Sequence, residues 1–172
     1  MQGQSQSQPQ SQSTSFKGLE SIERNVALIL GIAFLFVGIA GFLPGFVSLP
    51  SGAPDVPVDA PRLFFDDGYG YVLGLFPTNF VHNAVHIVVG ILGIAAATSF
   101  GGSLTYNRLF AISYIVIALM GILPFTNNTF GLMPIWGNNV WFNALTGAIA
   151  YYIGFIKPAK AMDSTNMPTP SV

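Results

Sequence analysis

The chain has 172 residues, of which 51% are hydrophobic and only 8% are charged. Soluble domains carry roughly a quarter charged residues, so this composition cannot coat a water-exposed globule and indicates a lipid-facing surface. A net charge of -1 gives no sign of a nucleic-acid partner, which would need a basic face. The absence of cysteine excludes disulfides, thiolate metal sites and cysteine nucleophiles.

Polar segments are predicted at both ends of the chain. Residues 1–19 begin with a run made almost entirely of Gln, Ser, Gly and Pro, which has nothing to bury and is predicted to be a disordered tail. Residues 158–172 are predicted to form a second, flexible tail. No cleavable signal peptide is expected, because the first apolar run is longer than a signal-peptide core.

Four apolar runs between these tails predict one membrane domain over residues 20–157. Each run has about 16–20 residues, near the roughly 20 that a helix needs to cross the hydrocarbon core of a bilayer. Core helices of a soluble protein would be shorter or apolar on one side only. The predicted helices cover residues 26–43, 81–100, 108–123 and 140–156, with a long outer loop at 44–79.

The positions of the basic residues predict an orientation in the membrane. Of the six basic residues, only Arg62, in the long loop, falls on the outer side. The other five fall on the opposite side: Lys17, Arg24, Arg108, Lys157 and Lys160. Because positive charge favours the cytoplasmic side, both termini are predicted to be cytoplasmic.

A four-residue motif before the second helix recurs before the fourth. Gly74-Leu75-Phe76-Pro77 matches Gly131-Leu132-Met133-Pro134, an offset of 57 residues, and Gly41-Phe42-Leu43-Pro44 resembles Gly121-Ile122-Leu123-Pro124. At the first offset His82 corresponds to Asn139 and His86 to Asn143. The predicted fold is therefore all-α: an integral membrane four-helix bundle made of two parallel helical-hairpin repeats.

His82 and His86 are the only histidines and lie four residues apart, on one face of the second predicted helix. Polar groups inside a membrane segment are costly and mark a functional or structurally committed site. If the faces of the second and fourth helices meet, one polar intramembrane cluster results. Its members are Asn79, His82, Asn83, His86, Asn139 and Asn143.

Several kinds of chemistry are open to the histidine pair. Two imidazoles can hold a metal, ligate haem or chlorophyll, move a proton or join helices by hydrogen bonds. A zinc site needs at least three protein ligands, and the helices offer no Asp, Glu or Cys beside the pair. No metal or cofactor is therefore predicted. If one binds, His82 and His86 are its expected ligands, with haem or chlorophyll as the alternative cofactors.

The segment from Gly74 to His86 resembles the hallmark of an uncharacterised bacterial family of four-helix membrane proteins, domain of unknown function 4383. The resemblance covers roughly residues 20–157 and includes Arg108. Family members usually show Asp-Asn-Trp-Leu-His before the fourth helix, where this chain reads Asn139-Val140-Trp141-Phe142-Asn143. The acid and the third histidine of the family are thus amides here, which weakens a metal or acid–base function carried over from it.

No catalytic residue is predicted, because the chain has no nucleotide-binding loop and no nucleophile–base pattern. We also expect no buried charge of the transporter kind, which argues against an ion-coupled carrier. The predicted function is a non-enzymatic accessory or interaction subunit of a complex in a bacterial inner or thylakoid membrane. Its partners would be the bilayer and either another membrane protein or a second copy. A cofactor-, pigment- or metal-binding protein is the alternative; a small carrier or membrane enzyme is less favoured.

Overall fold

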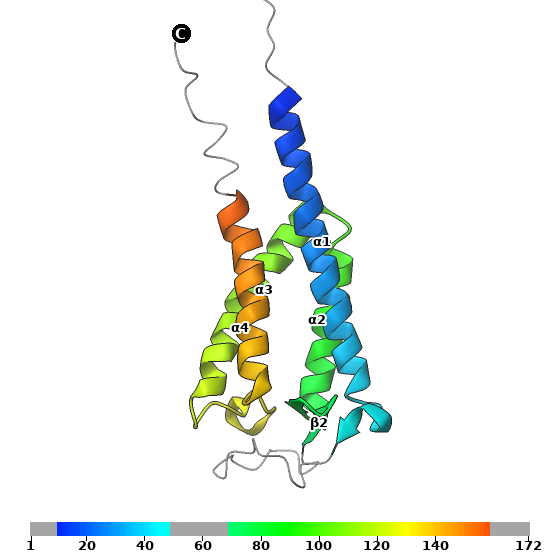
Figure 1. The fold of residues 1–172 in the computed structure, drawn as a ribbon, viewed down its shortest axis with the longest axis vertical. Coiled ribbons are helices and arrows are strands. Elements are labelled where there is room, and N and C mark those ends of the chain that lie inside the picture. The colour runs from blue at the N-terminus through cyan, green and yellow to red at the C-terminus, as the bar shows by residue number, and fades with distance from the viewer. Residues whose placement is uncertain (1–9, 49–68, 159–172) are drawn as a thin grey trace, which may run out of the picture.

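The computed structural model describes residues 10–48 and 69–158 of the chain. Within them four helices pack pairwise as two hairpins, α1 with α2 and α3 with α4, which lie side by side along the long axis of the molecule (Figure 1). The predicted arrangement of four helices as two hairpins is confirmed. The helices are α1 (Gln10–Ala40), α2 (Phe80–Ala96), α3 (Phe100–Ile122) and α4 (Asn138–Tyr151).

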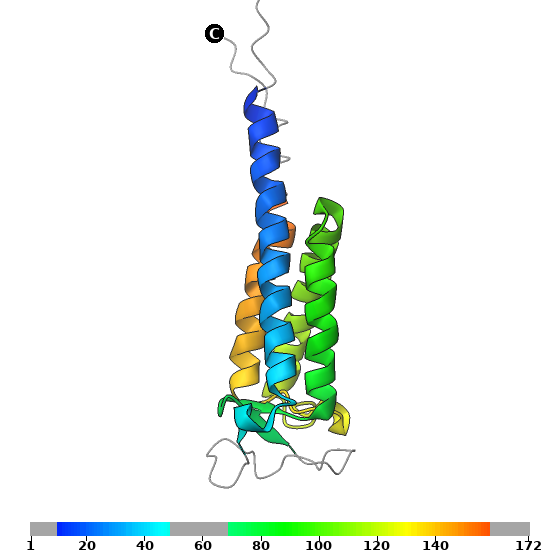
Figure 2. The ribbon, with the colours of Figure 1, turned by 90° about the vertical axis from the view of Figure 1, so that its right-hand side faces the viewer.

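The two ends of the bundle are built differently. One end, here called the sheet end, carries a small antiparallel sheet with the strand order β1-β2-β3. The other, the terminal end, carries the start of α1, the α2–α3 turn and the π-helical continuation of α4 (Figure 2). The remaining elements are β1 (Val47–Ser48), β2 (Gly70–Val72), β3 (Phe76–Thr78), η1 (Pro44–Phe46), η2 (Thr129–Gly131) and the π-helix η3 (Tyr152–Ile156).

The sheet lies within the predicted outer loop and was not expected from the sequence. Its strands have only two or three residues, too few for the alternating pattern that identifies a strand. Tyr71 in the central strand pairs with Ser48 on one side and Pro77 on the other. The pairing therefore ties the end of the first helix to the start of the second across the residues between them, of which 49–68 lie outside the described part.

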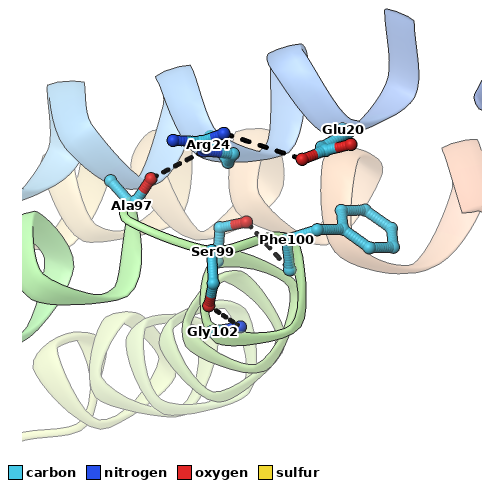
Figure 3. A network of polar contacts seen from close by, with 7 residues as sticks. Glu20, Arg24, Ala97, Ser99, Phe100 and Gly102 are labelled. Carbon is cyan, nitrogen blue, oxygen red and sulfur yellow. Dashed lines mark hydrogen bonds and ion pairs between the residues drawn. The ribbon is translucent and has the colours of Figure 1, made fainter. Parts of the chain in front are cut away.

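Two helix starts lie well before the predicted positions. Helix α1 begins at Gln10 rather than at 26, so it includes residues assigned to the polar tail, whereas residues 1–9 and 159–172 lie outside the described part. Helix α3 begins at Phe100 rather than at 108, because Ser99 caps it by accepting a hydrogen bond from the N–H of Gly102 at 3.1 Å (Figure 3). Apolar runs mark only the part of each helix that lacks polar residues.

Two of the helices are long and apolar enough to cross a membrane: Lys17–Ala40 of α1 and Phe100–Ile122 of α3. Helix α2 is apolar but has 17 residues, and α4 has 14 before its π-helical continuation. Large hydrophobic side chains lie exposed around the bundle, including Ile29, Ile32, Phe36, Leu92, Leu109, Ile112, Leu119 and Leu145.

Phe34 of α1 lies at the centre of the core and is 1% exposed. Its ring makes edge-to-face contacts with Phe110 and Tyr114 of α3, at centroid distances of 5.1 and 4.9 Å. A tilted contact at 5.6 Å reaches Phe142 of α4. One aromatic side chain of the first hairpin thus packs against both helices of the second, which fixes how the two hairpins face each other.

Candidate functional site

All six residues of the predicted polar cluster are buried at the sheet end of the bundle. None is more than 5% exposed. Four of them lie at the N-terminal end of the first hairpin's second helix, and two lie on the corresponding part of α4. The members are Asn79, His82, Asn83, His86, Asn139 and Asn143.

Asn79 caps α2 and also reaches the other hairpin. Its Oδ1 accepts a hydrogen bond from the backbone N–H of His82 at 3.0 Å, which satisfies one of the free donors at the helix start. Its Nδ2 donates to the backbone carbonyl of Leu132 at 2.9 Å. One side chain therefore begins a helix of the first hairpin and holds a loop of the second.

Asn83 acts inside the first hairpin. Its Nδ2 donates to the carbonyl of Gly41 at 2.7 Å, and its Oδ1 accepts a hydrogen bond from the hydroxyl of Thr78. Gly41 has no room for a larger side chain, because a Cβ there would overlap the Asn83 amide. The end of α1 and the start of α2 are joined by this amide.

Asn139 and His82 bind the same two carbonyl groups. Asn139 Nδ2 donates to Pro77 O at 2.8 Å and to Pro134 O at 3.2 Å. The imidazole of His82 also hydrogen-bonds to the backbone of Pro77 and Pro134. Because proline has no N–H, the imidazole must donate, and since its Nδ1 has no partner, Nε2 carries the proton. These contacts form a polar clasp between the two hairpins.

His86 lies deeper, between His82 and the aromatic core. The two imidazole centroids are 4.4 Å apart, and the His86 ring meets Phe34 edge to face at 5.0 Å. The Nδ1 atoms of both histidines are buried without a hydrogen-bond partner. Asn143 is 2% exposed one turn after Asn139 on α4. The site thus contains two imidazole nitrogen atoms, one on each histidine, that are buried away from bulk water and make no hydrogen bond.

The described residues contain no group of three or more His, Cys, Asp or Glu side chains close enough to hold a metal ion. The two histidines alone would leave a tetrahedral metal short of ligands. Among the described residues, the polar cluster itself therefore offers two imidazoles and the neighbouring amides, beside the hydroxyl of Thr78.

One buried ionisable side chain lies outside the predicted polar cluster, at a position the sequence analysis did not single out. Glu23 of α1 and Asn107 of α3 are both 0% exposed, near the terminal end of the bundle. Asn107 Nδ2 donates to Glu23 Oε2 at 2.6 Å and to the Glu23 backbone carbonyl at 3.1 Å. Glu23 was missed because it precedes the apolar run. Its spacing from Ala27 and Phe34, which places all three on the buried face of α1, would have found it.

Two arginines bind helix carbonyls at the same end of the bundle. Arg24 Nε donates to Ala97 O at 2.8 Å, and its NH1 lies 3.6 Å from Glu20 Oε1 (Figure 3). Arg108 Nε donates to Gly154 O at 2.8 Å. Each guanidinium satisfies a carbonyl near the end of the second helix of a hairpin, where the helix leaves such groups unpaired.

Comparison with curated proteins and with solved structures finds no match. A family model, described as a domain of unknown function, matches residues 24–156 and so spans all four helices apart from the first turns of α1. The resemblance seen in the segment from Gly74 to His86 is thereby confirmed. The chain belongs to the family of domain of unknown function 4383 (DUF4383).

Proposed function

We propose that this protein is a multi-pass bacterial membrane protein that serves as a non-enzymatic accessory or interaction subunit of a membrane complex. Two helices of sufficient length and apolar character support the location. The large hydrophobic side chains exposed around the bundle support it further, because a soluble protein would be expected to cover them.

Both termini are proposed to be cytoplasmic. Arg24 and Arg108 bind carbonyls at the terminal end, Ala97 O and Gly154 O, and Lys157 follows η3 there, which supports this orientation under the positive-inside rule. Because the chain has no cysteine, Ser48→Cys at the sheet end and Thr98→Cys in the α2–α3 turn can each report one side. Membrane-impermeant thiol reagents should label the Thr98→Cys variant from the cytoplasm only and the Ser48→Cys variant from outside only. Labelling of both variants from one side would refute the topology.

The two hairpins are further proposed to be repeats. Buried positions of α1 recur in α3 with a constant spacing of 80 residues, and the polar positions of α2 recur in α4 with a spacing of 57. The spacing of 80 relates Leu30 to Phe110 and Phe34 to Tyr114, and it also relates Gly41, just after α1, to Gly121. Equivalent residues also make equivalent contacts, since Gly90 packs on Leu35 and Gly147 on Ile115.

The non-enzymatic function is supported above all by what the polar cluster binds, which is the backbone of the neighbouring hairpin. Asn79, His82 and Asn139 all direct their donors to backbone carbonyls, and these bonds join the hairpins. Hydrogen bonds between membrane helices contribute about 0.6 kcal/mol each on average, so a few of them suffice to hold the sheet end closed. A cluster committed to holding the bundle together supports a structural role.

An apolar groove on α2 supports contact with a partner in the membrane. It has a volume of about 370 Å³ and is lined only by apolar side chains. Its lining residues are Phe80, Val81, Ala84, Val85, Val88 and Val89. Such a hollow on the surface of the bundle suits the side chains of a second transmembrane helix.

Isolation from native membranes in a mild detergent tests the proposal. The wild-type protein is expected to bring a defined membrane protein with it, and Ala84→Trp, which fills the groove, should lose that partner. Ile112→Trp, on the exposed face of α3, is the control and should keep it. Migration of the wild type as a lone monomer with no partner would contradict the proposal.

A cofactor-binding function is the second candidate, because the buried Nδ1 atoms of His82 and His86 have no partner. Each could be a ligand atom for a metal or a macrocycle. An absorption spectrum and a metal analysis of the purified protein decide the matter. Colour or bound metal that disappears in the double variant His82→Asn/His86→Asn would support this function, and a colourless, metal-free, folded protein would exclude it.

A further inference from the structure

The pair formed by Glu23 and Asn107 lies at the opposite end of the bundle from the histidines. It joins α1 to α3, and hence one hairpin to the other. Both side chains are completely buried, which is rare for a glutamate unless it is paired. The pair is used neither by the polar clasp nor by the groove on α2.

Two oxygen atoms of this pair lack a donor. Glu23 Oε1 and Asn107 Oδ1 are buried and have no hydrogen-bond partner, whereas Glu23 Oε2 accepts from Asn107 Nδ2. The orientation of the Asn107 amide is supported by its Nδ2, which also donates to the Glu23 backbone carbonyl. Exchanging its oxygen and nitrogen would lose both bonds, so the missing donor must come from elsewhere.

We propose that Glu23 and Asn107 form a proton-binding site, in which Glu23 is a neutral carboxylic acid and its Oε1–H donates to Asn107 Oδ1. A carboxylic acid and a primary amide each have one donor and one acceptor on adjacent atoms, so they can form two parallel hydrogen bonds. One proton, taken from the aqueous phase at the terminal end, supplies the donor that both oxygens lack. When the pair opens, the proton returns to that phase.

The charges around the pair agree with a neutral carboxyl in the closed bundle. Arg108 of α3 and Lys157 after η3 are the charged groups that act on Glu23 from neighbouring elements, and neither forms an ion pair with it among the described residues. Arg108 Nε is occupied by Gly154 O, and its guanidinium lies 5.3 Å from the Phe155 ring centroid. A buried carboxylate without an ion-pair partner is costly, whereas the neutral acid needs none.

The charged neighbours on the same helix are committed elsewhere. Glu20 and Arg24 face the surface, where they contact each other, and Arg24 Nε binds Ala97 O. After loss of the proton, the carboxylate would gain from moving toward Arg108 and Lys157. The site therefore has two states, a neutral acid–amide pair that holds α1 against α3 and an ionised carboxylate that loosens this contact.

Infrared spectroscopy of the full chain in lipid nanodiscs tests the proton directly. The chain contains two glutamates, Glu20 and Glu23, so labelling glutamate carboxyl carbons with ¹³C leaves two candidates for any shifted band. At pH 7 we expect a neutral carboxyl band that shifts with the label, persists in Glu20→Gln and is absent from Glu23→Gln. In Glu20→Gln, Glu23 is the only labelled glutamate. If its labelled carbon gives carboxylate bands only, Glu23 is ionised and the proposal is overturned; a buried water or a cation would then contact the two oxygens in place of the proton.

Thermal unfolding against pH gives an independent readout. The stability that the pair supplies is full below about pH 4, where a glutamate of the unfolded chain is also protonated, and is lost as the pH rises through the ionisation of Glu23. The unfolding midpoint of the wild type should therefore fall as the pH rises above about 5. Glu23→Gln, whose amide can form the same two bonds with Asn107, should lack this dependence. If the midpoint of Glu23→Gln falls with pH as steeply as that of the wild type, the proton site is contradicted. A wild-type midpoint that depends on sodium, without a neutral carboxyl band, would also contradict it.

Discussion

At the glycines between paired helices, α1 and α2 lie closer together than α3 and α4. A Cβ on Gly31 would lie 2.6 Å from the backbone nitrogen of Ile94, and one on Gly90 would lie 2.5 Å from that of Leu35. The equivalent contact at Gly147 of the second hairpin is 3.2 Å, to the backbone nitrogen of Ile115. The α1–α2 contact thus brings backbone against backbone, and the α3–α4 contact leaves space for small adjustments.

The hairpins also differ in the groups they bring to their common interface. At the sheet end His82 of the first hairpin and Asn139 of the second bind the same carbonyls. At the terminal end Glu23 of the first hairpin is bound by Asn107 of the second. At each end a titratable side chain of the closely packed hairpin meets an amide of the other. Rigid packing in one hairpin therefore positions the titratable groups, and neutral amides of the other satisfy them.

The difference in packing predicts the largest effect. Gly90→Ala should destabilise the protein by about 1–3 kcal/mol, because its Cβ meets the backbone of α1, which cannot move without opening the hairpin. Gly147→Ala should cost less than about 1 kcal/mol. Its Cβ requires only a slight shift of Ile115, and alanine is favoured over glycine inside a helix by about 1 kcal/mol, which offsets the cost of that shift. Reversible unfolding in mixed micelles measures both. Equal losses would remove the distinction between the hairpins.

The polar clasp predicts an intermediate effect. Asn139→Ala should cost about 1–2 kcal/mol, because it removes two hydrogen bonds, one of which joins the hairpins. Asn138→Ala is the neighbouring control. Its amide donates to Leu75 O at 3.0 Å from an exposed position, so the loss should stay within about 0.5 kcal/mol. Unfolding under the same conditions compares the two, and a neutral Asn139→Ala variant would argue against a clasp.

The histidine pair predicts the smallest effect on stability. The double variant His82→Asn/His86→Asn should lose less than about 1 kcal/mol, because an asparagine at 82 can still donate to the carbonyls that Asn139 binds. A loss of several kcal/mol would show that the imidazoles do more than hold the helices. Circular dichroism and unfolding of the apo protein measure this, apart from any change in bound cofactor.

Much of the fold could be predicted because apolar runs are visible in the chain. The four helices and their hairpin pairing followed from the runs, and the recurrence of Gly-Leu-x-Pro pointed to the facing polar positions. The apolar runs could not show that the polar residues just before them also belong to the helices. Glu23 of α1 and Asn107 of α3 lie outside or at the edge of the predicted apolar runs, and only packing of the two helices makes their burial tolerable.

The sequence by itself determined the number and order of the helices, the family and the candidate residues at the sheet end, because each depends on residue types at local spacings. The tertiary structure alone decided which polar atoms have partners. Asn139 reaches Pro77 across 62 positions of the chain, and Asn107 reaches Glu23 across 84. A hydrogen bond requires two atoms to approach within about 3 Å, and for residues so far apart only the packing of the two hairpins sets that distance.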